Sequence, residues 1–156
     1  MNKVSLFFAG DFCSKPSTSL ISVSDELPGI IKSCDLKVVN FEVPLKPKVE
    51  LPPQRYPRFW QNDDVPDFLR GLGFNLFSIA NNHTFDWGEE GFKKTKNALG
   101  EQSFGAGTYD EAYKVKVVEM NGIKIGQEFG LHLRITRSKQ VAEVILHLAE
   151  QFHIIP

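Results

Sequence analysis

Three short apolar runs constrain the fold of this chain more than any other sequence feature. The runs are Val4–Ala9, Leu36–Phe41 and Phe74–Ala80. Short, nearly continuous apolar runs are typical of strands that are buried on both faces, as in a parallel sheet. Segments with helical spacing follow each run, and this alternation predicts an α/β fold with mostly parallel strands.

Helical spacing of apolar residues predicts helices over Glu26–Ser33, Val65–Leu72 and Glu89–Leu99. A fourth segment, Ser138–Phe152, is predicted to be an amphipathic helix near the C-terminus. Its apolar residues would share one helix face. They are Val141, Val144, Ile145, Leu148 and Phe152.

Proline and glycine predict two of the connections. The segment Pro44–Pro66 contains six of the nine prolines, so we expect a long irregular surface excursion there. Asn121-Gly122 lies between the apolar stretches Val115–Met120 and Ile123–Gly126. This dipeptide supplies the positive φ angles of a type I′ turn and therefore predicts a hairpin.

Composition excludes several classes of protein. The chain has 156 residues, of which 42% are hydrophobic and 24% charged, and this excludes a disordered, collagen-like or coiled-coil chain. A net charge of −1 argues against a protein that binds nucleic acid through a basic face. Cys13 and Cys34 form no CxxC pair and make no disulfide framework. No apolar run is long enough for a signal peptide or a membrane span, so we expect a cytoplasmic chain with no membrane segment.

Polar side chains gather at the ends of the three predicted strands. They are, in chain order, Asp11, Asn40, Glu42, Asn81, Asn82, His83 and Asp86. In open α/β sheets, ligands bind beyond the carboxyl ends of the strands. Two carboxylates brought together there would repel each other unless a proton or a cation joined them. Oxygen ligands suit hard divalent metals, and Mn, Fe and Zn also accept imidazole, so the pattern favours a metal site.

Taken singly, some of these residues have simpler interpretations. Gly10-Asp11 is more often a turn or a helix cap than a ligand, and Glu42 is typical of a solvated loop carboxylate. The run Asn81-Asn82-His83 is harder to explain by packing, because it directly follows an apolar run. Residues that only cap turns or helices would not be expected to lie together at one edge of a sheet. The joint pattern therefore favours a functional site.

Other candidates favour structural interpretations. Gly105-Ala106-Gly107 predicts a tight turn, because it lacks the third glycine of a phosphate-binding loop. We expect a solvated helix face from Lys93, Lys94 and Lys96. The remaining histidines share no ligand spacing. They are His132, His147 and His153.

Taken together, these motifs resemble the CapA family of capsule and poly-γ-glutamate biosynthesis proteins, which have a calcineurin-like metallophosphoesterase fold. The resemblance extends over residues 4–126, and the Asn-Asn-His-x-x-Asp-x-Gly run is its most specific part. The matching stretches are Phe8–Asp11, Asp35–Glu42, Leu72–Asn75, Ser78–His83, Asp86–Gly88 with Gly91, Gly105–Gly107 and Asn121–Gly126.

The resemblance implies a role for each strand-end residue. Asp11, Glu42 and Asn82 would be ligands of a divalent metal such as Mn, Fe or Zn, with Asn40 and Asn81 as supporting residues. His83 would contact the scissile group as a general acid. Asp86 would orient His83, as carboxylates commonly do for such imidazoles. The implied reaction is hydrolysis of a phosphoester or an amide bond by a metal-activated water.

The chain also departs from this family. It has no Gly-His-His-Pro-His-like segment to complete a metal pair, and Gln127-Glu128 interrupts an expected strand after Gly126. We therefore expect residues 1–126 to form the N-terminal part of a metallophosphoesterase-type α/β sandwich, truncated and followed by a divergent tail over 127–156. With only about four ligand groups, metal binding is expected to be weak.

The same departures leave three functions open. The chain is predicted to be a metal-dependent hydrolase of capsule synthesis, a non-enzymatic subunit that binds capsular polymer or the synthesis machinery, or an inactive truncated fragment. Many relatives are membrane-anchored, whereas no anchor is predicted here. An exposed helix or sheet edge would also permit a homodimer.

Overall fold

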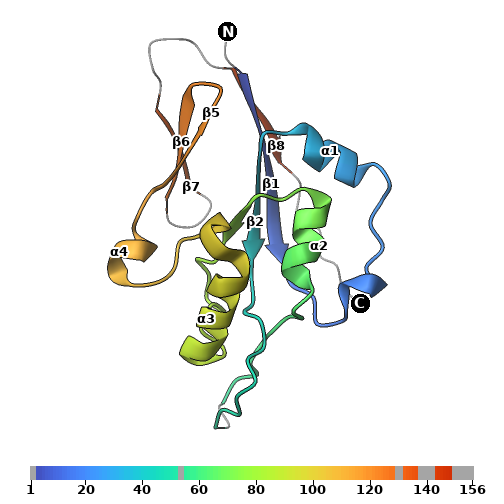
Figure 1. Cartoon of the computed structure of the whole chain (residues 1–156), viewed down its shortest axis with the longest axis vertical. Coiled ribbons are helices and arrows are strands. Elements are labelled where there is room, and N and C mark those ends of the chain that lie inside the picture. The colour runs from blue at the N-terminus through green and yellow to red at the C-terminus, as the bar shows by residue number, and fades with distance from the viewer. Residues whose placement is uncertain (1–2, 53–54, 129–131, 137–142, 149–156) are drawn as a thin grey trace.

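A computed structural model describes residues 3–52, 55–128, 132–136 and 143–148. Its centre is a five-stranded sheet in the order β4-β3-β2-β1-β8, and every neighbouring pair in it is parallel (Figure 1). The predicted α/β fold with a mostly parallel sheet is therefore confirmed. The strands of this sheet are β1 (Lys3–Phe12), β2 (Leu36–Phe41), β3 (Leu76–Ser78), β4 (Ser103–Phe104) and β8 (Glu143–Leu148).

Among the residues that the structure describes, four α-helices and two 3-10 turns connect or flank these strands. They are η1 (Thr18–Leu20), α1 (Leu27–Ser33), α2 (Val65–Leu72), α3 (Gly88–Leu99), η2 (Gly100–Gln102) and α4 (Tyr109–Ala112). Helix α2 covers the predicted residues, begins with a proline in its first turn and ends at Gly73, whose φ of 114° favours glycine. A Cβ at Gly73 would also lie 2.9 Å from the Cγ of Lys32. Glycine therefore lets the end of α2 pack closely against α1.

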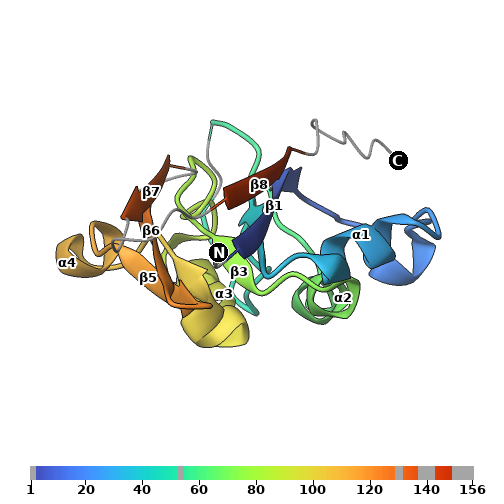
Figure 2. The same cartoon turned by 90° about the horizontal axis from the view of Figure 1, so that it is seen from above.

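Each face of the parallel sheet buries its own core. Phe7, Val39 and Phe41 face the side covered by the helices, where Leu69 of α2 and Leu99 of α3 pack on them. The alternate residues face the opposite side, as the two-residue period of a strand requires. That second core comprises Val4, Leu6, Phe8, Leu36, Val38, Leu76, Phe104, Ile123 and Ile125. Seen from above, α1 and α2 lie on one side of the parallel sheet and β5–β7 on the other (Figure 2).

The second side is covered by a three-stranded antiparallel sheet in the order β5-β6-β7. Its strands are β5 (Lys116–Met120), β6 (Ile123–Glu128) and β7 (His132–Thr136). The predicted hairpin is confirmed, because Asn121 and Gly122 between β5 and β6 have φ angles of 51° and 74°. The predicted interruption at Gln127-Glu128 is wrong. Both residues continue β6, with Gln127 paired to Lys116 and Glu128 paired to His132.

The predicted C-terminal amphipathic helix is wrong over Glu143–Leu148, which form strand β8. This strand pairs in parallel with β1, from Lys3 opposite Glu143 to Phe8 opposite Leu148. The run Val-Ile-Leu at its centre suits a strand as well as a helix, and pairing with β8 gives hydrogen-bond partners to the backbone groups along that edge of β1. Tertiary pairing therefore overrides the helical spacing. The other residues of the predicted helix, 138–142 and 149–152, lie outside the described part of the chain.

The proline-rich segment between β2 and α2 forms the predicted irregular excursion. A β-bridge between Leu45 and Gln61 joins its two ends. The side-chain amide nitrogen of Gln61, Nε2, donates to the carbonyl of Val43 at 2.7 Å. Leu45 is further held by the hydroxyl of Thr95 on α3, which accepts from the Leu45 N–H at 2.9 Å. The excursion therefore starts and ends beside the carboxyl end of the parallel sheet. In the residues that the structure describes, no helix is long and apolar enough to cross a membrane.

Candidate functional site

Strands β1 and β2 place the first two polar groups of the site side by side. The register between them shifts between Phe8 and Asp11, so that Asp11 pairs with Asn40. Such an irregularity re-aims the side chains that follow it, because a shift of one residue changes the face to which they point. Glu42 follows β2 directly, and its N–H donates to the carbonyl of Phe12 at 3.2 Å. The predicted meeting of these residues at one sheet edge is therefore observed.

Asn40 is the centre of this edge. Its side chain is buried, and its Nδ2 donates to Asp11 Oδ1 at 2.7 Å and to Glu42 Oε2 at 2.5 Å. Its Oδ1 accepts from the Nδ2 of Asn81 at 3.3 Å, which fixes the orientation of the Asn40 amide. One amide group therefore holds two carboxylates towards the same point, although Asn40 was predicted only as a supporting residue.

Glu42 is the carboxylate with the perturbed acidity. Its side chain is 18% exposed, and burial raises the pKa of this carboxyl above its usual range. The nearby charge of Asp11 raises the pKa further, whereas His83 and the Asn40 hydrogen bond lower it. Desolvation disfavours the charged form, and a second carboxylate adds repulsion. Keeping Glu42 charged beside Asp11 therefore costs free energy, and a bound cation would lower that cost.

His83 and Asp86 form a hydrogen-bonded pair across one turn. His83 Nδ1 lies 2.9 Å from Asp86 Oδ2, and both side chains are mostly buried. Because a carboxylate only accepts, Nδ1 carries the proton in this pair and Nε2 is left facing the site. His83 Nε2 lies 4.0 Å from Glu42 Oε1. The predicted orientation of His83 by Asp86 therefore has a direct geometric basis.

The turn that carries His83 is held by Asn81. Its Nδ2 donates to the carbonyl of Phe41 at 3.0 Å, and its Oδ1 accepts from the N–H of His83 at 3.0 Å. The hydroxyl of Thr84 donates to the carbonyl of Asn81 at 3.0 Å, within the same turn. Asn82 is exposed and has no hydrogen-bond partner among the described residues. The structure therefore brings Asn81 into the network and leaves the side chain of Asn82 outside it.

Phe59 was not predicted as a site residue, yet the excursion brings it onto the His83–Asp86 pair. Its N–H donates to Asp86 Oδ2 at 2.9 Å. Its ring meets the imidazole of His83 edge to face, with centroids 5.0 Å apart, and Lys15 Nζ lies 5.3 Å from the centroid of the same ring. The length of the excursion was the available sequence signal, because long connections in compact domains often carry function.

The side chains at this edge carry the kinds of atoms that bind divalent cations, and two of these side chains also point to one position. Asp11 and Glu42 converge on one amide nitrogen, as they would converge on a cation, and His83 Nε2 faces them. Carboxylate oxygen, amide oxygen and imidazole nitrogen suit Mn, Fe or Zn. Within residues 3–52, 55–128, 132–136 and 143–148, however, no three side chains of His, Cys, Asp or Glu form a group that could hold a metal ion. The arrangement therefore fits a partly built cation site.

Comparison with known proteins identifies the relatives of the chain. A family model described as bacterial capsule synthesis protein PGA_cap matches residues 6–134, which include every residue of the strand-end site. Two proteins of Sinorhizobium fredii (strain NBRC 101917 / NGR234), the uncharacterized proteins y4sH and y4uA, are each 50% identical to the chain over 36 residues. Each match covers 23% of this chain and 8% of the relative, so the chain spans only a small part of these relatives.

Proposed function

Because the chain belongs to the family of bacterial capsule synthesis proteins, we propose that it acts on capsular polymer at the strand-end site. The proposed reaction is hydrolysis of an amide bond in poly-γ-glutamate or of a phosphoester bond in a phosphorylated precursor. The observation that supports it best is the His83–Asp86 pair, whose free Nε2 faces Glu42 at 4.0 Å. An imidazole oriented by a carboxylate, next to converging carboxylates, is a suitable arrangement for general acid–base chemistry.

Each residue has a defined task in this proposal. Asp86 accepts a hydrogen bond from His83 Nδ1–H and so directs Nε2 towards the substrate. When His83 carries a proton on both ring nitrogens, it gives the Nε2 proton to the leaving group and returns to the form protonated on Nδ1 alone. Asp11, Glu42 and Asn82 would hold Mn, Fe or Zn, with Asn40 and Asn81 as their support. When bound, such a cation supplies a water that loses its proton near neutral pH.

The proposed activity is tested with a model phosphodiester and added Mn²⁺. We expect Asp11→Ala and His83→Ala each to lower the turnover number by roughly 100-fold or more, as the loss of a general acid does. Asp110→Ala is the matched control, because Asp110 is an exposed carboxylate of α4 and is not one of the strand-end residues. Equal rates in Asp11→Ala, His83→Ala and the control would contradict the proposed active site.

The proposed cation site is tested by calorimetric titration with Mn²⁺. We expect weak binding, because the site offers fewer ligand groups than the roughly six that such ions coordinate. Asp11→Asn is expected to abolish the heat of binding without a change in fold by circular dichroism. Sub-micromolar binding of two ions would contradict a partly built site.

A second candidate function is a non-enzymatic subunit that binds capsular polymer or assembles with the synthesis machinery. It is favoured by one observation, since Asn40 satisfies both carboxylates with its own amide hydrogens. The edge can therefore keep its shape without a cation. Polymer binding that survives Asn82→Ala, in a protein that hydrolyses no test substrate, would favour this candidate over the hydrolase.

A further inference from the structure

A cavity of about 270 Å³ lies on the helix side of the parallel sheet, between β1, α1 and α2. Residues 21–24, which connect η1 to α1, complete its lining. Five apolar residues that pack on the helix-side core without being fully buried all line this cavity. They are Ala9, Phe12, Leu27, Phe68 and Leu72. The helix-side core is therefore incompletely filled at this place, which we call the phenylalanine cavity.

Two pairs of phenylalanine rings line the phenylalanine cavity. Phe7 and Phe74 meet edge to face with their centroids 6.0 Å apart, and the centroids of Phe12 and Phe68 are 5.9 Å apart. Ala9 lies between Phe7 and Phe12 along β1 and lines the same cavity with a single methyl group. The space is therefore left over a small residue that has large aromatic residues on both sides of it in the strand.

No charged group points into the phenylalanine cavity from the part of the chain that the structure describes. Asp11 is the one charged residue in the lining. In the register of β1 with β2, Phe12 pairs with Phe41 and Asp11 pairs with Asn40. Phe12 and Phe41 belong to the helix-side core, so Asp11 directs its carboxylate to the other side, where Asn40 Nδ2 donates to it at 2.7 Å. The cavity therefore favours a neutral ligand.

Neither empty space nor water suits this cavity. Protein interiors are close-packed, and a void of this size removes van der Waals contacts from every side chain around it. A buried water needs about two to four polar partners. The hydroxyl groups of the lining belong to Ser22 and Ser24, which are exposed residues of the connection between η1 and α1. The walls therefore favour an apolar occupant.

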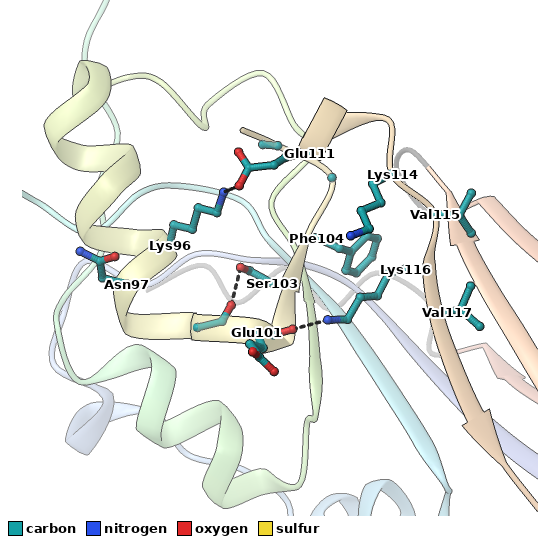
Figure 3. Close-up of a pocket in the computed structure, with 13 residues that line it drawn as sticks. Lys96, Asn97, Glu101, Ser103, Phe104, Glu111, Lys114, Val115, Lys116 and Val117 are labelled. Carbon is teal, nitrogen blue, oxygen red and sulfur yellow. Dashed lines mark hydrogen bonds and ion pairs between the residues drawn. The ribbon is translucent and has the colours of Figure 1, made fainter. Parts of the chain in front are cut away.

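A wider hollow of about 1000 Å³, between α3, β4 and the start of β5, has the opposite character. Charged side chains line it, and several of them already have partners (Figure 3). Lys96 Nζ lies 2.7 Å from a carboxylate oxygen of Glu111, and Lys116 Nζ donates to the backbone carbonyl of Glu101 at 2.6 Å. A ligand of that hollow would compete with these contacts, whereas a ligand of the phenylalanine cavity would displace none.

The volume and the walls of the cavity indicate the size and kind of ligand. A cavity of about 150 Å³ lined by Leu, Ile and Phe holds one benzene molecule. The 270 Å³ available here therefore leaves room for one ring with a short alkyl arm. Phenylalanine rings favour an aromatic partner, because ring edges and ring faces carry opposite partial charges.

We propose that the phenylalanine cavity is a binding site for a neutral aromatic molecule that consists of one ring and a short alkyl arm. The inference goes beyond the proposed function and does not depend on it, because the carboxylate of Asp11 lies on the other side of the sheet. Binding in the cavity needs neither a cation nor a substrate. It is therefore measurable apart from hydrolysis and from metal binding.

The test is calorimetric titration of the chain with butylbenzene in the presence of a chelator. We expect binding, and a rise in melting temperature of about 2–5 °C at saturation. Ala9→Leu places a larger side chain in the cavity and should weaken binding roughly 10-fold or more. Ala98→Leu is the matched control, because Ala98 packs on the same core but does not line the cavity, and it should bind like the unmodified chain.

A second variant and a charged probe complete the test. Leu72→Trp fills the cavity from α2 and should also weaken binding, which keeps the test valid if Ala9→Leu does not fold by circular dichroism. The probe 4-phenylbutyrate adds a carboxylate to nearly the same apolar body and should bind at least roughly 10-fold more weakly. Absence of butylbenzene binding, unweakened binding in the folded cavity variants, equal weakening by Ala98→Leu, or equally tight binding of 4-phenylbutyrate would each overturn the inference. The Mn²⁺ titration and the phosphodiester assay are unaffected by these outcomes.

Discussion

The strand-end site and the ion pair between Lys96 of α3 and Glu111 of α4 hold their charges in opposite ways. At the site, Asp11 and Glu42 converge on the buried amide of Asn40, and burial raises the pKa of Glu42. Glu111 meets Lys96 at the surface, and this partner lowers the pKa of Glu111 to about 2. The first arrangement is costly without a cation, whereas the second is favourable but weak. Electrostatic cost therefore accumulates where chemistry is proposed, and not at the surface ion pair.

The largest expected effect on stability comes from the centre of the site. Asn40→Ala removes both hydrogen bonds to the carboxylates and one of the two acceptors of Asn81 Nδ2, which keeps the carbonyl of Phe41. We expect the free energy of unfolding to fall by about 1–3 kcal/mol, the cost of unsatisfied buried polar groups. Urea unfolding measures this. Asn97→Ala is the matched control, because Asn97 is exposed on α3, and a fall as large as that of Asn40→Ala would remove the contrast between the regions.

The next effect tests whether the excursion positions the His83–Asp86 pair. Phe59→Ala keeps the N–H that donates to Asp86 but removes the ring that packs on His83. We expect the turnover number to fall roughly 10-fold at an unchanged KM, because the imidazole of His83 is held less firmly in its orientation without the ring. The nitrogen chemical shifts of the imidazole should move towards a mixture of tautomers. Tyr56→Ala, an exposed aromatic in the same excursion, is the control, and unchanged imidazole shifts in Phe59→Ala would contradict a positioning role.

A smaller effect tests the cost of the buried carboxylate. The pKa of Glu42 is raised above its usual 4.5, so the folded chain binds more protons than the unfolded chain between 4.5 and that higher pKa. Stability therefore falls as pH rises through this window. Glu42→Gln removes the titrating group, so at pH 7 we expect a higher melting temperature than for the unmodified chain, on the order of 2 °C. The gain should vanish at pH 4, and a variant that melts lower at pH 7 would show that Glu42 is stabilising.

The smallest effect, of opposite sign, is expected at the Lys96–Glu111 ion pair. The pKa of Glu111 is lowered to about 2 by Lys96 and by the N–H of Thr108, so its contribution to stability is present above 4.5 and lost as pH falls through about 2. Glu111→Gln keeps the capping box with Thr108 but loses the ion pair, so the melting temperature should fall slightly at pH 7. Added salt should reduce the difference. Glu101→Gln is the control, and an equal fall there would show that the ion pair contributes nothing.

Local sequence patterns predicted much of the fold. The bounds of β2 and α2 agree with the apolar run and the helical spacing that predicted them, and the Asn121-Gly122 turn has the expected positive φ angles. Strand β4 was missed because it has only two residues and its pairing with β3 leaves no periodic signal. The helix predicted over Ser138–Phe152 was wrong at β8, where apolar spacing alone does not separate a short strand from a helix.

The sequence by itself determined which polar residues lie at the strand ends, because strand–helix alternation sends the carboxyl ends of parallel strands to one edge. Only the tertiary structure decided how they meet. It placed Asn40 between the two carboxylates through an irregular register in β1, and it brought Phe59 back to His83 from the excursion. It also paired Lys96, predicted to face solvent, with Glu111 of α4. These contacts join residues far apart in the chain, and they depend on packing that no local pattern of residues records.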